Sequence, residues 1–355
     1  MSFSSFLIPA DFAVKQAMRQ LESSAGKILF VVDKHQKLIG SVTDGDIRRW
    51  ILNKGDLDHS IDQVCNLSPF TVTPGYTKAF VKGVMKKEKI HCIPVLDDSK
   101  TVIELLFWDV LFEGISPQKI RKSLEIPVVI MAGGMGSRLA PFTTILPKPL
   151  IPLGDKSILE KIIDQFLDYH CQHFYISVNY KSKIIKSYFE ELNPPYSLTY
   201  LYEDSPLGTA GCLQFLKEKV SGSFLVTNCD ILVEVDYAKL LQFHQKNKSD
   251  ITLVGSMKHY AIPYGVCEIE NGGKLVRINE KPEMSFLVNT GMYIVESRVL
   301  DMIPSKEVFH MTHLIEKVTA LGGKVDVYPI TENAWTDIGE WTEYKHALKH
   351  LKIDL

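Results

Sequence analysis

Apolar and polar residues follow two rhythms along the C-terminal two thirds of the chain. Largely apolar runs, as in 127–133 and 174–180, are typical of buried strands. The apolar residues of 158–167 recur instead at the spacing of one helical face, directly after Ser157, which is suited to cap a helix. This alternation of strands and helices predicts an α/β fold with a mostly parallel sheet and helices on both faces.

The same pattern continues through the rest of this part. Further strands are predicted at 198–204, at 223–232 and in four runs between 250 and 296, with helices near 182–191, from Thr209 and up to about 247. The turn Asn271-Gly272-Gly273 marks a hairpin between two of the later strands. In a Rossmann-like sheet of this kind, ligands bind beyond the C-terminal strand ends, so we expect a site at the loops after 127–133 and around Asp230.

The N-terminal part of the chain contains two similar units. Residues 28–51 and 91–112 each predict a strand, a turn, a second strand and a helix, and a helical segment precedes each unit, near 12–23 and 77–88. Two copies are too few for a solenoid, so they indicate a pseudo-symmetric pair packed on itself.

Composition and length are consistent with two soluble domains. The polar, basic stretch 116–126 divides the 355 residues, and we expect domains over 1–120 and 126–355. The net charge of -2, without a long basic stretch, argues against nucleic acid as a partner. The chain has no apolar run of about 18 residues, no basic start typical of a signal peptide, and no CxxC pair among its cysteines. We therefore expect a cytoplasmic protein that does not bind membranes.

The sharpest chemical signal is the glycine-rich run AGGMGSRL at 132–139. Glycines after a buried strand allow a tight turn and bring backbone N–H groups to phosphate oxygens. Arg138 adds a planar fork for phosphate, and Lys148 adds a further positive charge. The run is not a dinucleotide fingerprint, because Leu139 stands at the third glycine, and it lacks the GK[ST] of a P-loop. A purely structural turn would not explain the arginine and the lysine.

The segment 133–154 closely resembles the signature of the sugar-1-phosphate nucleotidyltransferases of the mannose-1-phosphate guanylyltransferase type, and the resemblance extends from about 127 to 345. It implies that a sugar 1-phosphate oxygen attacks the α-phosphorus of a nucleoside triphosphate and that pyrophosphate leaves, with Mg²⁺ as cofactor. The residues of such an enzyme serve mainly to position two anions and to neutralise their charge.

The resemblance also implies roles for individual residues. Asp230 and Asp337 would hold Mg²⁺, and the catalytic residues would be Arg138, Lys148 and Asp230. The nucleotide would be bound by Gly133, Gly134, Gly136, Ser137, Glu203, Gly208 and Thr209. The sugar phosphate would be bound by Glu280, Lys281, Asn289 and Gly291. Typical members start a helix with Thr-Pro after the second metal aspartate, whereas this chain has Glu340-Trp341.

Glu203 bears on the choice of base. It lies five residues before Gly208, where uridylyl and thymidylyl relatives often carry glutamine. A carboxylate only accepts hydrogen bonds, which suits the N1 and N2 donors of guanine better than the mixed edge of uracil or thymine. GTP is therefore the expected donor. UTP, dTTP and CTP fit the other motifs, and Glu203 could also be a solvated acid at a strand end.

The N-terminal pair resembles a tandem CBS module, which implies a regulatory or assembly role. Thr43 and Asp46 match the hydroxyl and acid of its ribose-binding pattern, whereas the second copy has Leu106 in place of the hydroxyl and retains Asp109. An adenine nucleotide would be the ligand and a homo-oligomer the assembly, but a structural module without ligand fits equally well. Both parts together resemble the CBS-fused guanylyltransferases of bacterial legionaminic acid pathways, which act on glucosamine 1-phosphate.

Other functions remain open. A glycosyltransferase would carry Asp-x-Asp at the strand end, but Asp230-Ile231-Leu232 lacks the second acid. A catalytically inactive nucleotide sensor would be expected to have lost the charged residues, yet all of them are present. Glucosamine 1-phosphate, mannose 1-phosphate and N-acetylglucosamine 1-phosphate all fit the motifs as acceptor.

Overall fold

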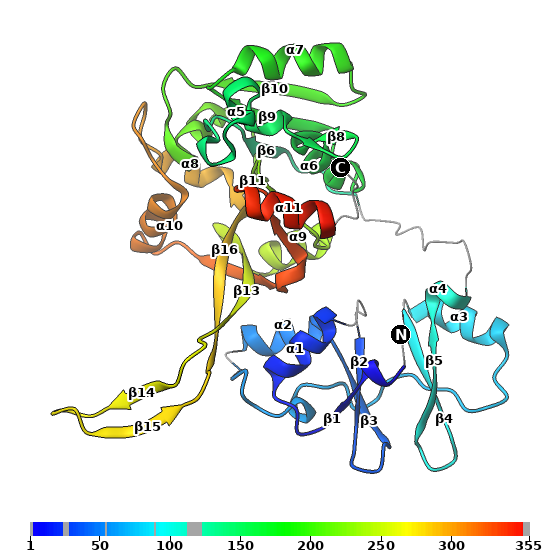
Figure 1. The fold of residues 1–355 in the computed structure, drawn as a ribbon. Coiled ribbons are helices and arrows are strands. Elements are labelled where there is room, and N and C mark those ends of the chain that lie inside the picture. The colour runs from blue at the N-terminus through cyan, green and yellow to red at the C-terminus, as the bar shows by residue number, and fades with distance from the viewer. Residues whose placement is uncertain (1–2, 24–27, 54, 89, 112–122, 351–355) are drawn as a thin grey trace. The chain divides into compact units, whose positions relative to one another are not determined.

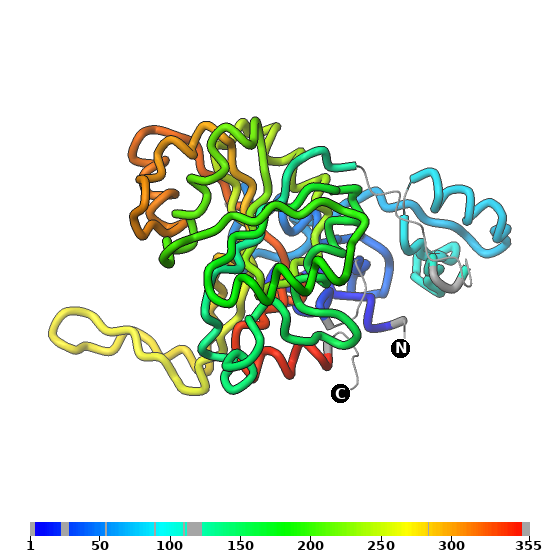
Figure 2. The backbone as a smooth tube through the Cα atoms, turned by 90° about the horizontal axis from the view of Figure 1, so that it is seen from above, coloured from blue at the N-terminus to red at the C-terminus, as the bar shows by residue number. Residues whose placement is uncertain are grey.

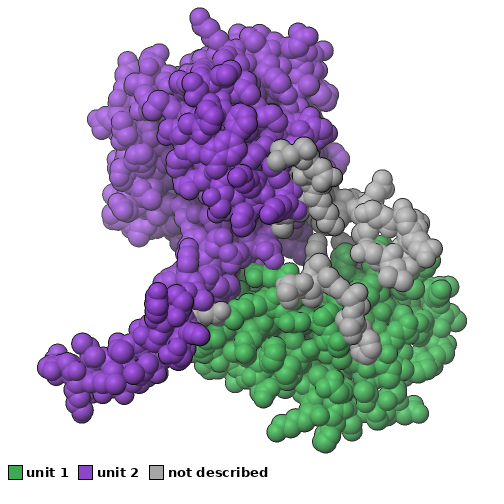
Figure 3. Space-filling view, viewed as in Figure 1, with its two compact units in different colours: residues 1–120 green, residues 121–355 purple. Residues whose placement is uncertain are grey.

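The computed structural model describes residues 3–23, 28–53, 55–88, 90–111 and 123–350 (Figure 1). The chain divides into two compact units, unit 1 over Met1–Ile120 and unit 2 over Arg121–Leu355 (Figure 3). No helix in the described ranges is long and apolar enough to cross a membrane.

Unit 1 contains the two strand–turn–strand–helix units predicted from the sequence. Its elements, with η for 3₁₀ helices, are η1 (Phe3–Phe6), β1 (Leu7–Pro9), α1 (Val14–Ser23), β2 (Ile28–Val32), β3 (Leu38–Thr43), α2 (Asp44–Leu52), η2 (Ile61–Gln63), α3 (Lys78–Glu88), β4 (Cys92–Leu96), β5 (Val102–Phe107) and α4 (Trp108–Leu111). Strands β1, β2 and β3 form one sheet, and β4 and β5 form another. Phe30 and Val32 share a buried cluster with Cys92 and Leu105, so the two copies pack against each other.

Unit 2 is built on a sheet whose strands, among the described residues, lie in the order β10-β9-β6-β11-β16-β13-β17. These strands are β6 (Val128–Met131), β9 (His173–Val178), β10 (Ser197–Tyr202), β11 (Ser223–Asn228), β13 (Ile251–Ala261), β16 (Glu283–Glu296) and β17 (Val325–Ile330). Neighbouring strands are parallel except where β16 runs antiparallel to β11 and β13. The predicted α/β fold with a mostly parallel sheet is therefore confirmed.

Helices cover both faces of this sheet. The helices of unit 2 in the described ranges are η3 (Ser137–Leu139), α5 (Phe142–Ile145), η4 (Lys148–Leu150), α6 (Ile158–Leu167), α7 (Ser182–Leu192), α8 (Gly208–Gly211), η5 (Cys212–Leu216), α9 (Tyr237–Asn247), η6 (Ser297–Met302), α10 (Met311–Ala320), η7 (Glu332–Ala334) and α11 (Trp341–His350). Val128 and Ile130 of β6 belong to a core shared with α6, α7, α9 and α11, whereas Val129 belongs to a second core with η5, η6 and α10. Successive side chains of a strand point to opposite faces, so both faces of β6 are buried.

The start of α6 shows how local sequence positions these helices. Ser157 accepts a hydrogen bond from the Glu160 N–H, and the Glu160 carboxylate accepts one from the Ser157 N–H at 2.9 Å. This reciprocal pair satisfies backbone donors that the first helical turn leaves without partners. The predicted Ser157 cap is thus confirmed.

Two predicted elements end earlier than expected. The strand predicted over 223–232 is interrupted, because β11 ends at Asn228 and β12 (Ile231–Val233) pairs instead with β18 (Trp335–Asp337). The helix predicted from Thr209 is a single turn, α8, that continues as the 3₁₀ helix η5. Glycines at both ends of α8 are poor helix formers, which explains the short helix.

Strands β13 and β16 run past the edge of the sheet as a two-stranded ribbon. Their pairing extends from Gly255–Asn289 to Ala261–Glu283, so both strands are longer than the sequence pattern predicted. Strands β14 (Val266–Ile269) and β15 (Leu275–Asn279) continue it as a hairpin around the predicted glycine turn. We call residues 258–287 the arm. Figures 1 and 2 show from two directions that the arm stands clear of the rest of unit 2.

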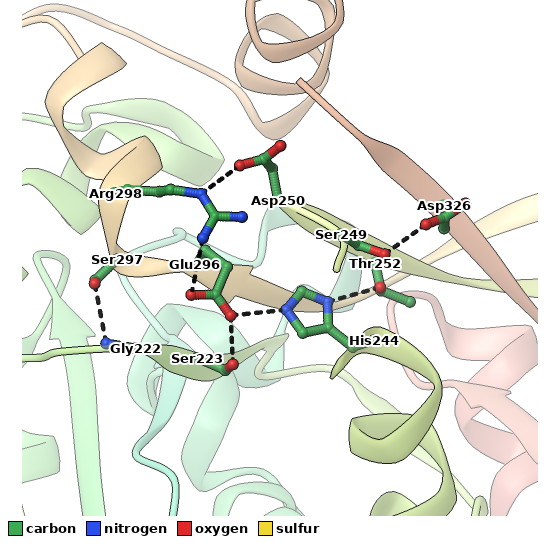
Figure 4. A network of polar contacts seen from close by, with 10 residues as sticks. All are labelled: Gly222, Ser223, His244, Ser249, Asp250, Thr252, Glu296, Ser297, Arg298 and Asp326. Atoms are coloured by element: carbon green, nitrogen blue, oxygen red, sulfur yellow. Dashed lines mark hydrogen bonds and ion pairs between the residues drawn. The ribbon is translucent and has the colours of Figure 1, made fainter. Parts of the chain in front are cut away.

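A network of polar side chains lies at the opposite end of β11 and β16 (Figure 4). His244 is buried between the Thr252 hydroxyl, 2.8 Å away, and the Glu296 carboxylate, 3.1 Å away. Arg298 joins Glu296 to Asp250. Burial lowers the pKa of His244, and Glu296 acts in the opposite direction. These contacts fasten the end of β16 to the beginning of β13.

Candidate active site

The glycine-rich loop follows β6, in the centre of the sheet. Gly136 has a φ of 66°, which favours glycine, and a Cβ there would lie 2.8 Å from Cβ of Lys148. A Cβ on Gly133 would lie 2.8 Å from Oε1 of Glu203, whereas one on Gly134 would meet nothing within 4 Å. Close packing therefore explains two of the glycines. Gly134, beside open space, leaves its backbone accessible to a ligand.

Lys148 lies beside this loop and is buried. Its residue is only 7% exposed, and Nζ donates to Oδ2 of Asp230 at 2.5 Å. Asp230 lies two residues after the end of β11, which is the parallel neighbour of β6. A buried lysine needs a compensating negative charge, and Asp230 supplies it. The structure thus brings together two residues that lie 82 positions apart.

Asp337 lies beside Asp230 because the chain returns as β18. Asp337 is the register partner of Ile231, and the Ile338 N–H donates to the Asp230 carbonyl at 2.7 Å. Burial raises the pKa of Asp337, and the negative charge of Asp230 raises it further, against the Gly339 N–H, which donates to its carboxylate at 2.6 Å. We call the loop 132–139 together with Lys148, Asp230 and Asp337 the cradle.

The two carboxylates of the cradle fit a magnesium ion. Mg²⁺ is commonly held by one or two carboxylates and completes its shell with substrate phosphates and water. The mutual repulsion that raises the pKa of Asp337 is relieved by a cation between the carboxylates. No group of three or more His, Cys, Asp or Glu that could hold a metal occurs among the described residues. An ion at Asp230 and Asp337 would therefore depend on the substrate for further ligands.

We expect Asp337→Asn to raise the melting temperature at neutral pH in the absence of divalent ions. The folded state raises the pKa of Asp337 above 3.8, so its ionised form opposes folding above the raised pKa. Asparagine removes this charge and keeps an oxygen for the Gly339 N–H. Calorimetric scans at several pH values check the prediction, since the difference should vanish as the pH falls to about 3.8. A variant less stable than the parent at neutral pH would contradict it.

Arg138 lies at the rim of the cradle. Its side chain is 63% exposed, and Nη1 donates to Oε1 of Glu340 at 2.8 Å. The hydrogen bond to Glu340 raises the pKa of Arg138, and the charges of Asp230 and Asp337 add to the effect. Arg138 is therefore within electrostatic reach of both carboxylates.

Helix α11 begins directly after Glu340, although this chain lacks the Thr-Pro typical of the family it resembles. The Trp341 indole donates to the Ala140 carbonyl at 2.8 Å, and its ring lies 4.9 Å from that of Phe142. Tyr344 donates to the Pro152 carbonyl at 2.7 Å. Helix α11 thus holds the loop after the glycines in place.

Glu203 is buried behind the cradle. One carboxylate oxygen accepts a hydrogen bond from the Ser177 hydroxyl, and the other accepts the Leu207 N–H at 2.9 Å. Each oxygen can accept a further donor, because a carboxylate oxygen has two lone pairs. The alternative of a solvated acid is wrong, since Glu203 is only 9% exposed.

Gly208 and Thr209 contact the start of α10. A Cβ on Gly208 would lie 2.7 Å from the Phe309 carbonyl, and the Thr209 hydroxyl accepts the Met311 N–H at 3.0 Å. The side chain of Thr209 therefore forms a hydrogen bond with the first residue of α10. The hydroxyl keeps its own O–H as a donor for a ligand.

The predicted sugar-phosphate residues divide into two groups. Asn289 donates to the Tyr293 hydroxyl at 2.7 Å, and a Cβ on Gly291 would collide with Asn228, at the end of β11. This pair therefore lies next to the cradle. Glu280 and Lys281 lie on the arm, and among the described residues neither side chain has a hydrogen bond or ion pair with the cradle.

Sequence reasoning missed three residues of the site, namely Ser177, Asn228 and Glu340. Ser177 and Asn228 are polar residues in otherwise apolar strands, and this is the signal that could have identified them. Glu340 is an acid where typical relatives have threonine, but its partner Arg138 is 202 residues away and no local pattern joins them.

In unit 1, Thr43 and Asp46 form a capping box at the start of α2. The Thr43 hydroxyl donates to Oδ2 of Asp46 at 2.6 Å, and the same oxygen accepts the Thr43 N–H at 2.8 Å. Both residues also line a cavity of about 520 Å³, together with Arg49, Phe70 and His91. The cavity joins residues of both copies of the repeat. The side chain of Asp109 lies outside the described residues.

Comparison with protein families gives two matches. The model of the family described as nucleotidyl transferase matches residues 127–353, and the CBS domain model matches residues 1–53. These matches agree with the resemblances of both parts, and the matched CBS segment covers the first copy of the repeat.

Among curated relatives, a mannose-1-phosphate guanyltransferase of Yarrowia lipolytica is 31% identical over 224 residues, covering 60% of each chain. The bifunctional protein GlmU of Methanococcus aeolicus is 29% identical over 242 residues, which are 64% of this chain and 56% of that protein. This chain thus spans about 60% of the length of the curated relatives that it matches.

Among solved structures, HddC from Yersinia pseudotuberculosis aligns with a TM-score of 0.51 and 25% identity, covering 64% of this chain and 99% of HddC. A second crystal structure of HddC, with 24% identity to this chain, is complexed with GMP-PN. The fold of unit 2 therefore has solved counterparts.

Proposed function

This chain belongs to the nucleotidyl transferase family, and on that premise we propose that it transfers a nucleoside monophosphate from a nucleoside triphosphate to a sugar 1-phosphate. The products are a nucleotide sugar and pyrophosphate. The observation that carries the proposal is the convergence of Lys148, Asp230 and Asp337 on the glycine-rich loop. Arg138 at the rim supports it.

The cations of the cradle are held by carboxylates that a phosphate can replace. Lys148 pairs with Asp230, and Arg138 pairs with Glu340. These ion pairs fix the positions of both cationic side chains before an anion binds. We infer that the triphosphate takes over these donors, while backbone N–H groups near Gly134 contact its oxygens. Bound Mg²⁺ would supply positive charge that offsets the repulsion between the two substrates. Asp230 and Asp337 would hold it.

The chemistry needs little beyond position and charge. The acceptor is itself a phosphate oxygen that is ionised at neutral pH, so no residue has to remove a proton from it. The cradle has to keep this oxygen in line with the leaving pyrophosphate and shield one anion from the other. Asn289 lies two residues before Gly291, which packs against Asn228 at the end of β11, and we infer that Asn289 contacts the sugar.

GTP is the proposed donor, and Glu203 is the proposed reader of its base. Its remaining lone pairs lie behind Gly133, and they suit the adjacent N–H donors of guanine. We expect Glu203→Gln to reduce the preference for GTP over UTP about 10- to 100-fold, because one acceptor becomes a donor. The ratio of kcat/KM values for the two nucleotides measures this.

Ser177→Ala is the matched control for Glu203→Gln. It removes a hydrogen bond to Glu203 but leaves the carboxylate charge, so GTP and UTP should be affected alike. If Glu203→Gln also lowered kcat/KM equally for both nucleotides, Glu203 would only support the loop. The base specificity would then have another origin.

A pyrophosphate-release screen tests the proposed function directly. GTP, UTP, dTTP and CTP are each combined with glucosamine 1-phosphate, mannose 1-phosphate and N-acetylglucosamine 1-phosphate, with Mg²⁺ present. We expect release of pyrophosphate with GTP and glucosamine 1-phosphate. The nucleotide sugar formed from this pair would be a precursor of legionaminic acid. No release with any combination would favour the catalytically inactive nucleotide sensor.

We further propose that unit 1 binds an adenine nucleotide. Its cavity of about 520 Å³ is of ordinary size for a small ligand, and it combines Phe70 for a base, Asp46 for a ribose and Arg49 for a phosphate. Titration calorimetry with ADP should show binding that Arg49→Ala weakens. Repeating the screen with ADP present would reveal whether binding regulates turnover.

A further inference from the structure

Lys181 breaks several rules of helix formation at the start of α7. It precedes the first helical turn, where extended dihedrals and a Ser, Thr, Asp or Asn side chain are usual, as at Ser157. Lys181 has instead a φ of 52° and a ψ of 32°, a left-handed conformation that favours glycine, and its side chain does not cap the helix. Its positive charge also opposes the dipole of α7, whose positive end lies there. Local preferences therefore do not explain why this residue is a lysine.

The ammonium group of Lys181 binds the end of α5. Nζ donates to the Thr143 carbonyl at 3.1 Å and to the Thr144 carbonyl at 2.6 Å. A helix leaves its last carbonyls without partners, and Pro147, four residues after Thr143, has no N–H that could bind the Thr143 carbonyl. Lys181 thus supplies a donor that the local sequence lacks.

Thr143 joins this contact to the cradle. Its side chain is buried, only 4% of the residue being exposed, and Cγ2 lies 3.0 Å from the position that a Cβ on Gly136 would take. Gly136 packs in turn against the side chain of Lys148. Trp341 of α11 binds the same loop at the Ala140 carbonyl. The loop after the glycines is therefore held by α11 at one point and by Lys181 at another.

The segment that contains Lys181 also contacts the proposed reader of the base. Asn179, two residues earlier, donates from Nδ2 to the Glu203 carbonyl at 2.6 Å. Strand β9 lies between its parallel neighbours β6 and β10, so the loops that follow these three strands meet at one edge of the sheet (Figure 1). Residues 179–181 therefore connect the glycine-rich loop, proposed to bind the phosphates, with Glu203.

We propose that Lys181 is a positioning residue of the nucleotide site, which holds the glycine-rich loop in a fixed position relative to Glu203. The inference rests on the proposed function and adds to it a residue that acts through the loop. A nucleotide bound at its phosphates and at its base needs both contact regions in place beforehand, because ordering a loop during binding costs affinity. The left-handed backbone of Lys181 fits this role, since strain that persists despite its cost is concentrated at functional sites.

Lys181→Gly separates the ammonium group from the backbone. Glycine adopts the left-handed conformation without strain and removes the charge from the start of α7, so the melting temperature should fall by no more than about 4 °C. The loop loses a contact that holds it, and we expect about ten-fold weaker binding of GTP and a similar rise in KM for GTP. The KM for glucosamine 1-phosphate should stay within about two-fold of the wild-type value.

Lys181→Arg tests whether a cation with several donors is sufficient. Arginine keeps the positive charge and can donate to both carbonyls, so GTP should bind within about three-fold of the wild-type affinity. Titration calorimetry of the full chain with GTP and Mg²⁺, without a sugar 1-phosphate, measures binding. Steady-state pyrophosphate release measures both KM values, and calorimetric scans give the melting temperatures.

Lys248→Gly is the matched control. Lys248 follows α9 with a φ of 55°, is exposed, and directly precedes Ser249 of the polar network at the opposite end of β11 and β16. The same exchange therefore relieves the same backbone conformation without a change at the loop. GTP affinity and both KM values should stay within about two-fold of wild type. If this control weakened GTP binding as much as Lys181→Gly, the inference would be wrong.

The outcomes separate the inference from the proposed function. Wild-type GTP affinity and KM in Lys181→Gly would overturn the inference, while pyrophosphate release by the wild-type protein would leave the function intact. A large fall in melting temperature with equal losses for both substrates would also overturn it, because Lys181 would then support only the fold. A wild-type protein that releases no pyrophosphate with any pair would overturn the proposed function. Weaker GTP binding by Lys181→Gly would in that case still support the inference, and unchanged binding would overturn it.

Discussion

Replacing Asp230 by asparagine is expected to lower kcat about 10³-fold while the protein keeps its fold. The change removes one of the two carboxylates proposed to hold Mg²⁺. It also leaves Lys148 without its charged partner at 2.5 Å. Asparagine still offers an oxygen to Lys148, and Asp337 keeps a carboxylate within electrostatic reach of that lysine. The Asp230 backbone carbonyl keeps its hydrogen bond from Ile338, so the fold should persist, with a lower stability because a buried lysine has lost its direct partner. Steady-state pyrophosphate release and circular dichroism together check both parts.

Asp155→Asn is a matched control for this variant. Asp155 is an exposed aspartate of the same unit, paired with Lys161 at 2.8 Å and outside the cradle. Its loss should change turnover less than about two-fold, because exposed ion pairs contribute little. If Asp230→Asn behaved like this control, Asp230 would have no part in the reaction.

Removing the guanidinium of Arg138 is expected to lower kcat/KM by about 10²- to 10³-fold. Arg138 is exposed at the rim, and its field reaches both Asp230 and Asp337. Arg138→Ala should therefore weaken the binding of the triphosphate in the transition state. The stability of the protein should not change, because little of the Arg138 side chain is buried. Arg138→Lys should recover only part of the rate, since an ammonium group lacks the planar fork. Steady-state kinetics at varied GTP concentration give kcat/KM for both variants.

Glu340→Gln tests whether the charge of Arg138 matters or only its hydrogen bond to Glu340. Glutamine keeps an oxygen for the guanidinium but removes the competing carboxylate. We expect a change of less than about ten-fold, and mainly in KM, because the arginine itself is intact. A loss as large as that of Arg138→Ala would show that the anchor and not the guanidinium matters.

Much of the fold could be predicted from sequence because it follows short-range rules. Ser157 caps α6 through a neighbour three residues away, and the apolar runs of β6 and β11 mark a sheet buried on both faces. The short α8 and the interruption at Asp230 could not be predicted. They depend on contacts with Phe309 and Ile338, which lie about 100 residues further along the chain.

Only part of the candidate site could be predicted from the sequence. The glycine-rich loop contains Arg138 and is followed by Lys148, so a phosphate-binding role could be predicted from the residues themselves. Asp337 entered only through resemblance to a family, because no spacing relates it to Asp230. Ser177, one partner of Glu203, lies on the neighbouring strand β9, 26 residues away. The outward course of the arm cannot be seen in its ordinary strand pattern.

The late position of β18 and α11 has a consequence for the newly made protein. On the ribosome, the glycine-rich loop and Asp230 emerge before the segment that carries Asp337 and Trp341, by roughly 5–20 s for about 100 residues. During this interval the nascent chain has neither its second carboxylate nor the helix that steadies the loop. The proposed nucleotide transfer is therefore expected only of chains that have been synthesised through α11.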